Sequence, residues 1–273
     1  MLSGIYQMIR DMALLAKSPL SRAKKMDVLG AYWKLWITRP SDKALILGFT
    51  VHTHSFANVW YLFREIFVHN EYFFRATSQT PLIIDAGANI GMATLYFSWL
   101  YPQATIHAFE ADPQTVITLR KNIESNTLHN VHVHHAAVAA ADGTMTFYTD
   151  PRAAGSLVTS TVEGRVAYDA VQVPAVDLAK FVRELGTNVS LLKMDIEGGE
   201  VTAIGALTRD NVLTNLDQAI LEYHHQINQQ PAALAPFLTQ WETAGFGYRL
   251  HTNAMPLAQQ GKFQDILFYF YKS

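Results

Sequence analysis

Residues 85–91, D-A-G-A-N-I-G, combine an acidic side chain with a glycine turn directly after an apolar run. The pattern predicts a strand over 82–85, a turn at Gly87 and Gly91, and a helix over 90–100. Such a turn brings backbone N–H groups close to a ligand. A G-x-G-x-x-G loop for dinucleotides would carry a glycine where this chain has Asp85. A carboxylate there repels a pyrophosphate but suits a cationic ligand with an ammonium and a sulfonium, such as S-adenosylmethionine (SAM). A plain strand–turn–helix connection without a ligand is the alternative.

Four predicted strands end in acidic residues: Asp85, Glu110, Asp195 and, with His224 beside it, Glu222. In a parallel sheet, ligands bind beyond the carboxyl ends of the strands. Glu110 follows Gly91 by 19 residues, the spacing at which an acid accepts hydrogen bonds from a ribose diol. Ala137 or Val138, at the end of a further predicted strand over 131–138, is placed to contact an adenine edge. Asp142 is placed to accept from the adenine amino group, with an ordinary Asp-Gly turn as the equal alternative.

The segment K-M-D-I-E-G-G-E at 193–200 places three carboxylates in six residues, with two glycines between them. Asp195 either points into the cleft or caps the helix that follows. Glu222 and His224 are two residues apart on a strand and therefore face the same side. A histidine beside a carboxylate is a candidate general base. Asp195, Glu222 and His224 are thus the candidate catalytic residues, and the same three offer oxygen and nitrogen ligands for a divalent cation.

Length and composition favour one large α/β domain with an N-terminal extension. The chain has 273 residues, 49% of them hydrophobic and 16% charged, with a net charge of −2 and no cysteine. This charge gives no reason to expect nucleic acid as a partner, and the lack of cysteine excludes thiol catalysis. No apolar run reaches the ~18 residues of a membrane span. The N-terminus has no convincing signal-peptide pattern, so we expect a cytoplasmic protein.

Strands that alternate with helices predict a mostly parallel sheet covered on both faces, with the last two strands, 247–251 and 265–271, as an antiparallel edge hairpin. We expect a helical extension or cap over residues 1–60 and the catalytic domain over 61–273. A membrane-surface or partner helix is the alternative for the extension, which carries a basic cluster and an aromatic group. The small polar segment 155–161 is expected to be a mobile loop at a pocket mouth.

From about residue 67 to 224 the chain resembles the FkbM-type SAM-dependent methyltransferases. The resemblance rests on F-V-H-N-E-Y, D-A-G-A-N-I-G, F-E-A-D-P, L-L-K-M-D-I-E-G-G-E and L-E-Y-H. It implies a Rossmann-like methyltransferase fold and methyl transfer from SAM to a hydroxyl oxygen of a sugar or another small molecule. It further implies that Glu110 binds the ribose hydroxyls and that Tyr72 reaches the methionine carboxylate. By the same resemblance, Asp85, Gly87, Asn89 and Gly91 are expected to form the methionine and ribose side of the cofactor site, and Ala88 and Asp195 are further cofactor-binding candidates.

The function expected from the sequence is therefore that of an O-methyltransferase, with His224 or Asp195 as the base. A SAM-binding module that has lost catalysis is a second reading, against which the intact acids at the strand ends argue. A nicotinamide-dependent oxidoreductase is disfavoured by the missing first glycine. The aromatic N-terminal segment either caps the acceptor pocket or forms a contact in a homodimer.

Overall fold

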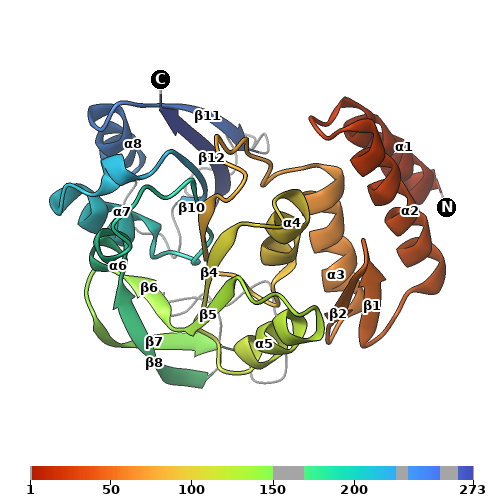
Figure 1. Ribbon diagram of the computed structural model, residues 1–273, viewed down its shortest axis with the longest axis horizontal. Helices are drawn as coiled ribbons and strands as arrows, with labels where there is room; N and C mark the ends of the chain where they lie inside the picture. The colour runs from red at the N-terminus through yellow and green to blue at the C-terminus, as the bar shows by residue number, and fades with distance from the viewer. Residues whose placement is uncertain (1, 150–168, 226–232, 253–263, 273) are drawn as a thin grey trace, which may run out of the picture.

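Seven strands form one sheet in the order β11-β12-β10-β9-β3-β4-β5 (Figure 1). The computed structural model describes residues 2–149, 169–225, 233–252 and 264–272. Neighbouring strands from β10 to β5 are parallel, and β12 runs antiparallel to both β10 and β11. The strands are β3 (Leu82–Ala86), β4 (Thr105–Glu110), β5 (Val131–His135), β9 (Leu191–Met194), β10 (Gln218–His225), β11 (Phe246–Thr252) and β12 (Gln264–Lys272).

This topology confirms the predicted Rossmann-like α/β fold with an antiparallel C-terminal pair. The pair has one feature that the pattern did not indicate: β12 lies inside the sheet and β11 forms the edge. Phe268 and Phe270 of β12 are buried, with relative exposures of 0% and 1%, as an internal position requires. The sheet order changes direction at β3, so the carboxyl ends of β3, β4 and β9 open onto the same crevice.

Two hydrophobic clusters cover the two faces of the sheet. Adjacent residues of β3 point to opposite faces, and accordingly Ile83 belongs to one cluster and Ile84 to the other. The first cluster includes α4 (Met92–Leu100) and α5 (Thr115–Ser125), and the second includes α6 (Leu178–Glu184), α7 (Glu200–Arg209) and α8 (Leu234–Thr243). Figure 1 shows α4 and α5 on one side of the sheet and α6, α7 and α8 on the other.

The N-terminal part packs onto the first cluster. It comprises α1 (Leu2–Lys17), α2 (Arg22–Thr38), the hairpin β1 (Lys43–Ile46) and β2 (Phe49–His52), and α3 (Phe56–Phe63), which continues as a π-helical turn over Arg64–Val68. Two asparagines of α5 and its C-cap bind the backbone of β2. The His52 N–H donates to Asn122 at 2.6 Å, and the Thr50 N–H donates to Asn126 at 2.8 Å. The expected boundary at residue 60 falls within α3, and both sides of it contribute to one core.

A second, three-stranded sheet branches from the main one. The strand expected over 131–138 is interrupted at Ala136, so that β5 stays in the main sheet and β6 (Ala137–Ala139) pairs with β8 (Asp169–Asp177). β8 also pairs with β7 (Gly143–Thr149). The segment 155–161 lies outside the described residues. Within the described part of the chain, the helices are all too short or too polar to cross a membrane.

Candidate active site

The glycine turn after β3 is held against the end of β4. The N–H groups of Gly87 and Ala88 donate to the Phe109 carbonyl at 3.0 and 2.8 Å. The Asn89 N–H donates to Glu110 Oε2 at 2.8 Å, and the Asp112 N–H donates to Glu110 Oε1 at 2.8 Å. One oxygen of the Glu110 carboxylate thus binds the glycine turn after β3, and the other binds the backbone just after β4. The sequence spacing that marked Glu110 therefore corresponds to a direct contact with the turn.

Gly87 is required because the chain passes very close to another element. Its φ of +78° lies in the left-handed region, and a Cβ atom on it would lie 1.7 Å from the backbone oxygen of Asp195. The Asp195 N–H in turn donates to the Ala86 carbonyl at 3.0 Å. The D-A-G-A-N-I-G and K-M-D-I-E-G-G-E segments therefore fit together as one unit.

Asp85 lies beneath the turn, and its charge is met by the protein itself. Its side chain has no exposed surface, accepts a hydrogen bond from the Thr94 hydroxyl at 2.6 Å and lies 3.3 Å from Lys193 Nζ. Lys193 also donates to the Gly87 carbonyl at 2.7 Å. Burial works against the charge of Lys193, but Asp85 and Asp195 outweigh it and raise the pKa of the lysine. Asp85 therefore lies beneath the turn and pairs with Lys193 and Thr94 of the protein. The sequence had suggested that it would face a cationic ligand.

Sequence analysis missed Lys193, although a signal was present. A lysine inside an otherwise apolar strand, one residue before Met194 and two before Asp195, needs a partner to be buried. The structure supplies Asp85 as that partner on the neighbouring strand, in direct register with Lys193. The pairing depends on the order of the strands, which the local sequence does not contain.

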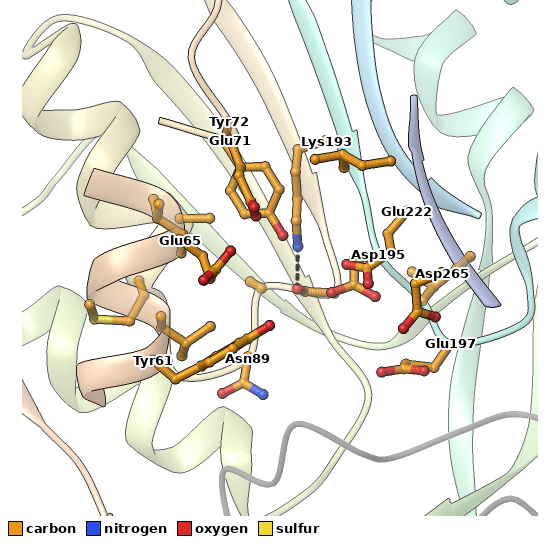
Figure 2. A pocket seen from close by; sticks show the side chains of 18 of the residues that line it. Tyr61, Glu65, Glu71, Tyr72, Asn89, Lys193, Asp195, Glu197, Glu222 and Asp265 are labelled. Atoms are coloured by element: carbon orange, nitrogen blue, oxygen red, sulfur yellow. Dashed lines mark hydrogen bonds between the residues drawn. The ribbon is translucent and has the colours of Figure 1, made fainter. Parts of the chain in front are cut away.

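A cavity of about 910 Å³ opens over the glycine turn and the strand ends. Of the residues expected at a site, it is lined by Tyr72, Gly87, Ala88, Asn89, Glu110, Ala137, Asp195 and Glu222. Figure 2 shows two groups of acids facing each other: Glu65 and Glu71 on the side of Tyr61, and Asp195, Glu197, Glu222 and Asp265 on the side of the sheet. The structure therefore brings most of the expected residues to one hollow.

Four expected residues lie outside the lining of this cavity, as far as the chain is described: Asp85, Gly91, Asp142 and His224. Gly91 is the N-cap of α4, with a φ of +94°. Asp142 is exposed, pairs with Lys180 Nζ at 2.8 Å and accepts from the Asp177 N–H at 2.9 Å. Those contacts are those of a turn residue that anchors the start of α6, which was the alternative interpretation of Asp142.

His224 is buried between carboxylates, with a relative exposure of 5%. Its Nδ1 lies 2.9 Å from Glu200, its Nε2 lies 3.0 Å from Glu197, and Asp195 is 3.8 Å away. Burial disfavours the charged ring, but the hydrogen bonds to Glu197 and Glu200 outweigh it and raise the pKa of His224 well above its usual value. The two carboxylates therefore favour the protonated ring, in which both nitrogens donate and neither is available to take a proton from an acceptor.

The same contacts bear on the expected cation site. Asp195 and His224 group with Glu197, while Glu222 and His224 group with Asp265, in each case within 4.8 Å. The three expected ligands thus do not form one group of three. An imidazolium has no free lone pair to give a metal ion. A divalent cation at either group would therefore have to displace the proton that the neighbouring carboxylates favour on His224.

Glu222 is a titratable group at the acidic strand end of β10 whose environment suits proton transfer. Its pKa is raised to about 8, first by burial and then by the charges of Asp195 and Asp265, while His224 acts in the opposite direction. A carboxyl group with a pKa near neutrality can take up and release a proton under working conditions. Glu222 lines the cavity, as a proton acceptor for a bound molecule must.

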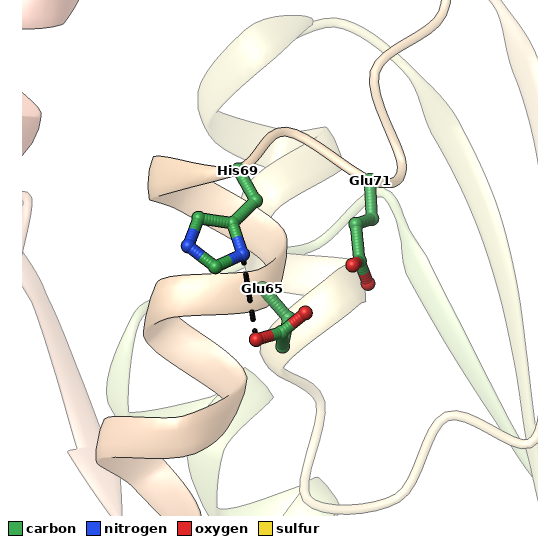
Figure 3. A group of neighbouring side chains, drawn as sticks. All are labelled: Glu65, His69 and Glu71. Carbon is green, nitrogen blue, oxygen red and sulfur yellow. Dashed lines mark ion pairs between the residues drawn. The ribbon is translucent and has the colours of Figure 1, made fainter. Parts of the chain in front are cut away.

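The opposite wall carries a charged network that extends from Asp11 of α1 to Glu65 and His69, and Figure 3 shows its part at Glu65, His69 and Glu71. Buried Asp11 pairs with Arg64 at 2.6 Å and with His69 Nε2 at 2.9 Å, and His69 Nδ1 faces Glu65 at 3.4 Å. Burial raises the pKa of Glu65, but His69 outweighs this and lowers it to about 2. Burial and the hydrogen bond with Glu65 raise the pKa of Glu71 to about 10. The cavity therefore has one ionised and one protonated carboxyl group side by side on this wall.

Comparison with known proteins places these features in a family. Residues 85–250 match the family model described as the methyltransferase FkbM domain. The chain is 31% identical over 178 residues to the 31-O-demethyl-FK506 methyltransferase FkbM of Streptomyces tacrolimicus, covering 60% of this chain and 68% of the relative. It is 29% identical over 194 residues to Methyltransferase 1 of Beauveria bassiana, covering 64% and 78%.

A solved structure of Methyltransferase FkbM from Methylobacillus flagellatus aligns with 98% of this chain and 60% of its own, at 14% identity and a TM-score of 0.48. The sequence matches carry the assignment, since they span the glycine turn, Glu110, Asp195 and Glu222. The chain belongs to the FkbM methyltransferase family.

Proposed function

We propose that this methyltransferase moves the methyl group of SAM to a hydroxyl oxygen of a small-molecule or sugar acceptor. The observation that carries the proposal is that one cavity is lined by both the glycine turn with Glu110 and the acidic strand end with Glu222. The first set suits a nucleoside cofactor, and the second suits removal of a proton. One of the relatives is named for a 31-O-demethyl substrate, which supports oxygen as the accepting atom.

The glycine turn and the residues beside it form the half of the site that we assign to the cofactor. SAM, when bound, supplies a methyl group activated by a sulfonium. Glu110 is positioned to accept from ribose hydroxyls, because its carboxylate lies at the turn and lines the cavity. Burial raises the pKa of Glu110 to about 7, against the effect of the two N–H donors. Ala137 and Phe109 offer apolar contacts for a base, and Tyr72 lies near Lys193, whose Nζ is 5.4 Å from the centre of its ring.

The acceptor half lies between the two acidic walls. Tyr61, Glu65 and Glu71 provide hydroxyl and carboxyl groups on one side, and Glu222 and Asp265 provide carboxyl groups on the other. Such groups accept hydrogen bonds from several hydroxyls at once. This supports an acceptor with more than one hydroxyl group, as in a sugar.

The protein contributes alignment and proton removal. As the acceptor oxygen bonded to the methyl carbon, the bond from that carbon to the sulfonium sulfur would break and leave the thioether S-adenosylhomocysteine. The hydroxyl proton of the acceptor would pass to a carboxylate, and Glu222 is our candidate to hold it. Asp195 lines the same part of the cavity and is the second candidate. Positioned proton acceptors of this kind contribute about 10²- to 10⁴-fold to rate.

Thermal unfolding with saturating S-adenosylhomocysteine or NAD tests the cofactor first. A ligand at 100 times its dissociation constant stabilises the native state by about 2.7 kcal/mol. We expect this with the nucleoside and not with NAD, and transfer of labelled methyl to hydroxylated acceptors from SAM. Stabilisation by NAD alone would support the oxidoreductase reading. Binding without transfer to any sugar or other hydroxylated acceptor would support a module without catalysis.

A further inference from the structure

The outward side of α2 carries four exposed apolar side chains between residues 26 and 37. Met26, Trp33, Trp36 and Ile37 have relative exposures of 60%, 38%, 49% and 70%. With 3.6 residues per turn, all four fall within about a third of the helix circumference. The inward side is apolar as well and packs into the core through Val28, Ala31, Tyr32 and Leu35. A helix at the surface of a protein normally has a polar outer face, so apolar residues on both faces indicate that something covers the outer one.

The neighbouring helix continues this character. Ile5, Tyr6 and Ile9 of α1 have relative exposures of 53%, 73% and 60%. Both helices lie at the end of the molecule away from α6, α7 and α8 (Figure 1). We call the seven exposed side chains on α1 and α2 the N-terminal apolar surface.

Charge distinguishes this part of the chain from the rest. Residues 1–40 contain seven lysines and arginines but only two acids, whereas the remainder contains 14 basic and 21 acidic residues. One of the two acids, Asp11, is buried and paired with Arg64. Exposed basic residues lie along both helices: Arg10, Lys17, Arg22, Lys34 and Arg39. The N-terminal apolar surface is therefore bordered by positive charge on a protein that is otherwise acidic.

We infer that the N-terminal apolar surface docks on an anionic lipid membrane. Tryptophan has an apolar ring with a polar N–H and is enriched at membrane interfaces. Basic side chains beside it are attracted to anionic headgroups. The contact lies on the membrane and does not span it, in keeping with the length and polarity of the helices.

A second copy of the chain fits this surface less well. A two-fold contact would bring the same patch of each molecule together. The excess of five positive charges over residues 1–40 would then face an equal excess, and like charges oppose such an association. An anionic lipid surface supplies the opposite sign.

Co-sedimentation with large unilamellar vesicles tests the inference. We expect the full chain to bind vesicles of phosphatidylglycerol and phosphatidylcholine, at least tenfold more than vesicles of phosphatidylcholine alone, and to release as salt is raised. Ile37→Glu should reduce binding at least tenfold, and Lys34→Glu should reduce only the anionic preference. Met26→Glu provides an independent second variant, since its side chain is also exposed.

Ile117→Glu is the matched control, because Ile117 is an isoleucine of 59% exposure on a different helix, α5. It should bind vesicles like the wild type, and all variants should keep the wild-type melting temperature within a few degrees. No binding to anionic vesicles at low salt, or equal loss in Ile117→Glu, would overturn the inference. Concentration-dependent dimers in light scattering that Ile37→Glu abolishes, without vesicle binding, would assign the surface to a second copy instead.

Discussion

A Cβ atom on Gly87 would lie 1.7 Å from the backbone oxygen of Asp195, although the two residues are more than a hundred positions apart in the chain. The glycine is therefore required by sterics as well as by its φ of +78°. The glycine turn and the segment that begins at Asp195 therefore pack directly against each other, and the Asp195 N–H also donates to the Ala86 carbonyl. This contact is the basis of the first prediction.

Gly87→Ala should destabilise the protein by roughly 2–5 kcal/mol, because a left-handed alanine costs about 1–2 kcal/mol and overpacking adds about 1–3. Denaturant unfolding measures the change. Gly205→Ala is the control: Gly205 lies inside α7 with open space around it, so alanine should stabilise by about 0.5–1 kcal/mol. Equal stability of Gly87→Ala and wild type would contradict the fit described here.

Glu110→Ala should weaken S-adenosylhomocysteine binding at least tenfold, about 1.4 kcal/mol, since the Asn89 and Asp112 N–H groups lose their acceptor and the ribose loses its partner. Because the pKa of Glu110 is about 7, wild-type affinity should rise between pH 6 and 8 as the carboxylate forms. Isothermal titration calorimetry measures both. The Asp142→Asn variant is the control, because Asp142 lies outside the cavity lining, and it should bind S-adenosylhomocysteine like the wild type. An equal loss of affinity in Asp142→Asn would support the prediction that Asp142 binds the adenine amino group.

His224→Gln should cost roughly 3–5 kcal/mol, because Glu200 is 2% exposed and would remain as a buried carboxylate without its cation. The folded-state pKa of His224 is above its unfolded value of 6.5, so the stabilisation is complete below pH 6.5 and is lost as pH rises through the folded pKa. The difference in unfolding free energy between wild type and variant should therefore shrink in alkaline buffer. A difference that grows with pH would show that the ring is neutral in the native state.

Glu222→Gln should lower kcat by about 10²- to 10⁴-fold while S-adenosylhomocysteine binds as before. The wild-type rate should rise with pH and level off above about 8, the pKa that burial and the neighbouring acids give Glu222. Asp195→Asn is the comparison, measured with the same acceptor. If Asp195→Asn loses the activity and Glu222→Gln keeps it, the proton acceptor is Asp195.

Glu71→Gln and Glu65→Gln should behave differently despite the same chemical change. Glu71, with a pKa of about 10, is protonated at neutral pH, so an amide replaces a neutral group, and below about pH 4.5, where the unfolded glutamate is protonated as well, stability should change little. Its raised pKa also means that wild-type stability falls as pH rises from about 4.5 towards 10, and this fall should lessen in Glu71→Gln. Glu65→Gln removes the carboxylate that faces His69 and should lower the melting temperature. Equal effects would mean that the proton lies on Glu65.

Local motifs predicted the parts of the site that a short stretch of chain defines. The glycine turn and the spacing to Glu110 are of this kind, because a strand, a turn and the end of the next strand form one unit. The partners of buried charges could not be predicted in this way. Lys193 pairs with Asp85 because β9 lies beside β3 in the sheet. The pKa of His224 is raised because Glu197 and Glu200 hydrogen-bond to its ring. Glu65 is held ionised by His69, which also pairs with Asp11 on α1, and Glu71 in F-V-H-N-E-Y is held protonated by burial beside Glu65.

The cavity is assembled from two stretches of sequence that meet only in the folded protein. The match to the family begins at Asp85, whereas Tyr61, Glu65, His69 and Glu71 precede it and form the opposite wall. Residues 77–80 between them are exposed and have no regular structure. On our proposal, a genetic crossover at this point would exchange the wall that meets the acceptor, together with Tyr72, and leave the glycine turn, Glu110 and Glu222 intact. New acceptors would thus arise by recombination, without any change to the glycine turn or to Glu110.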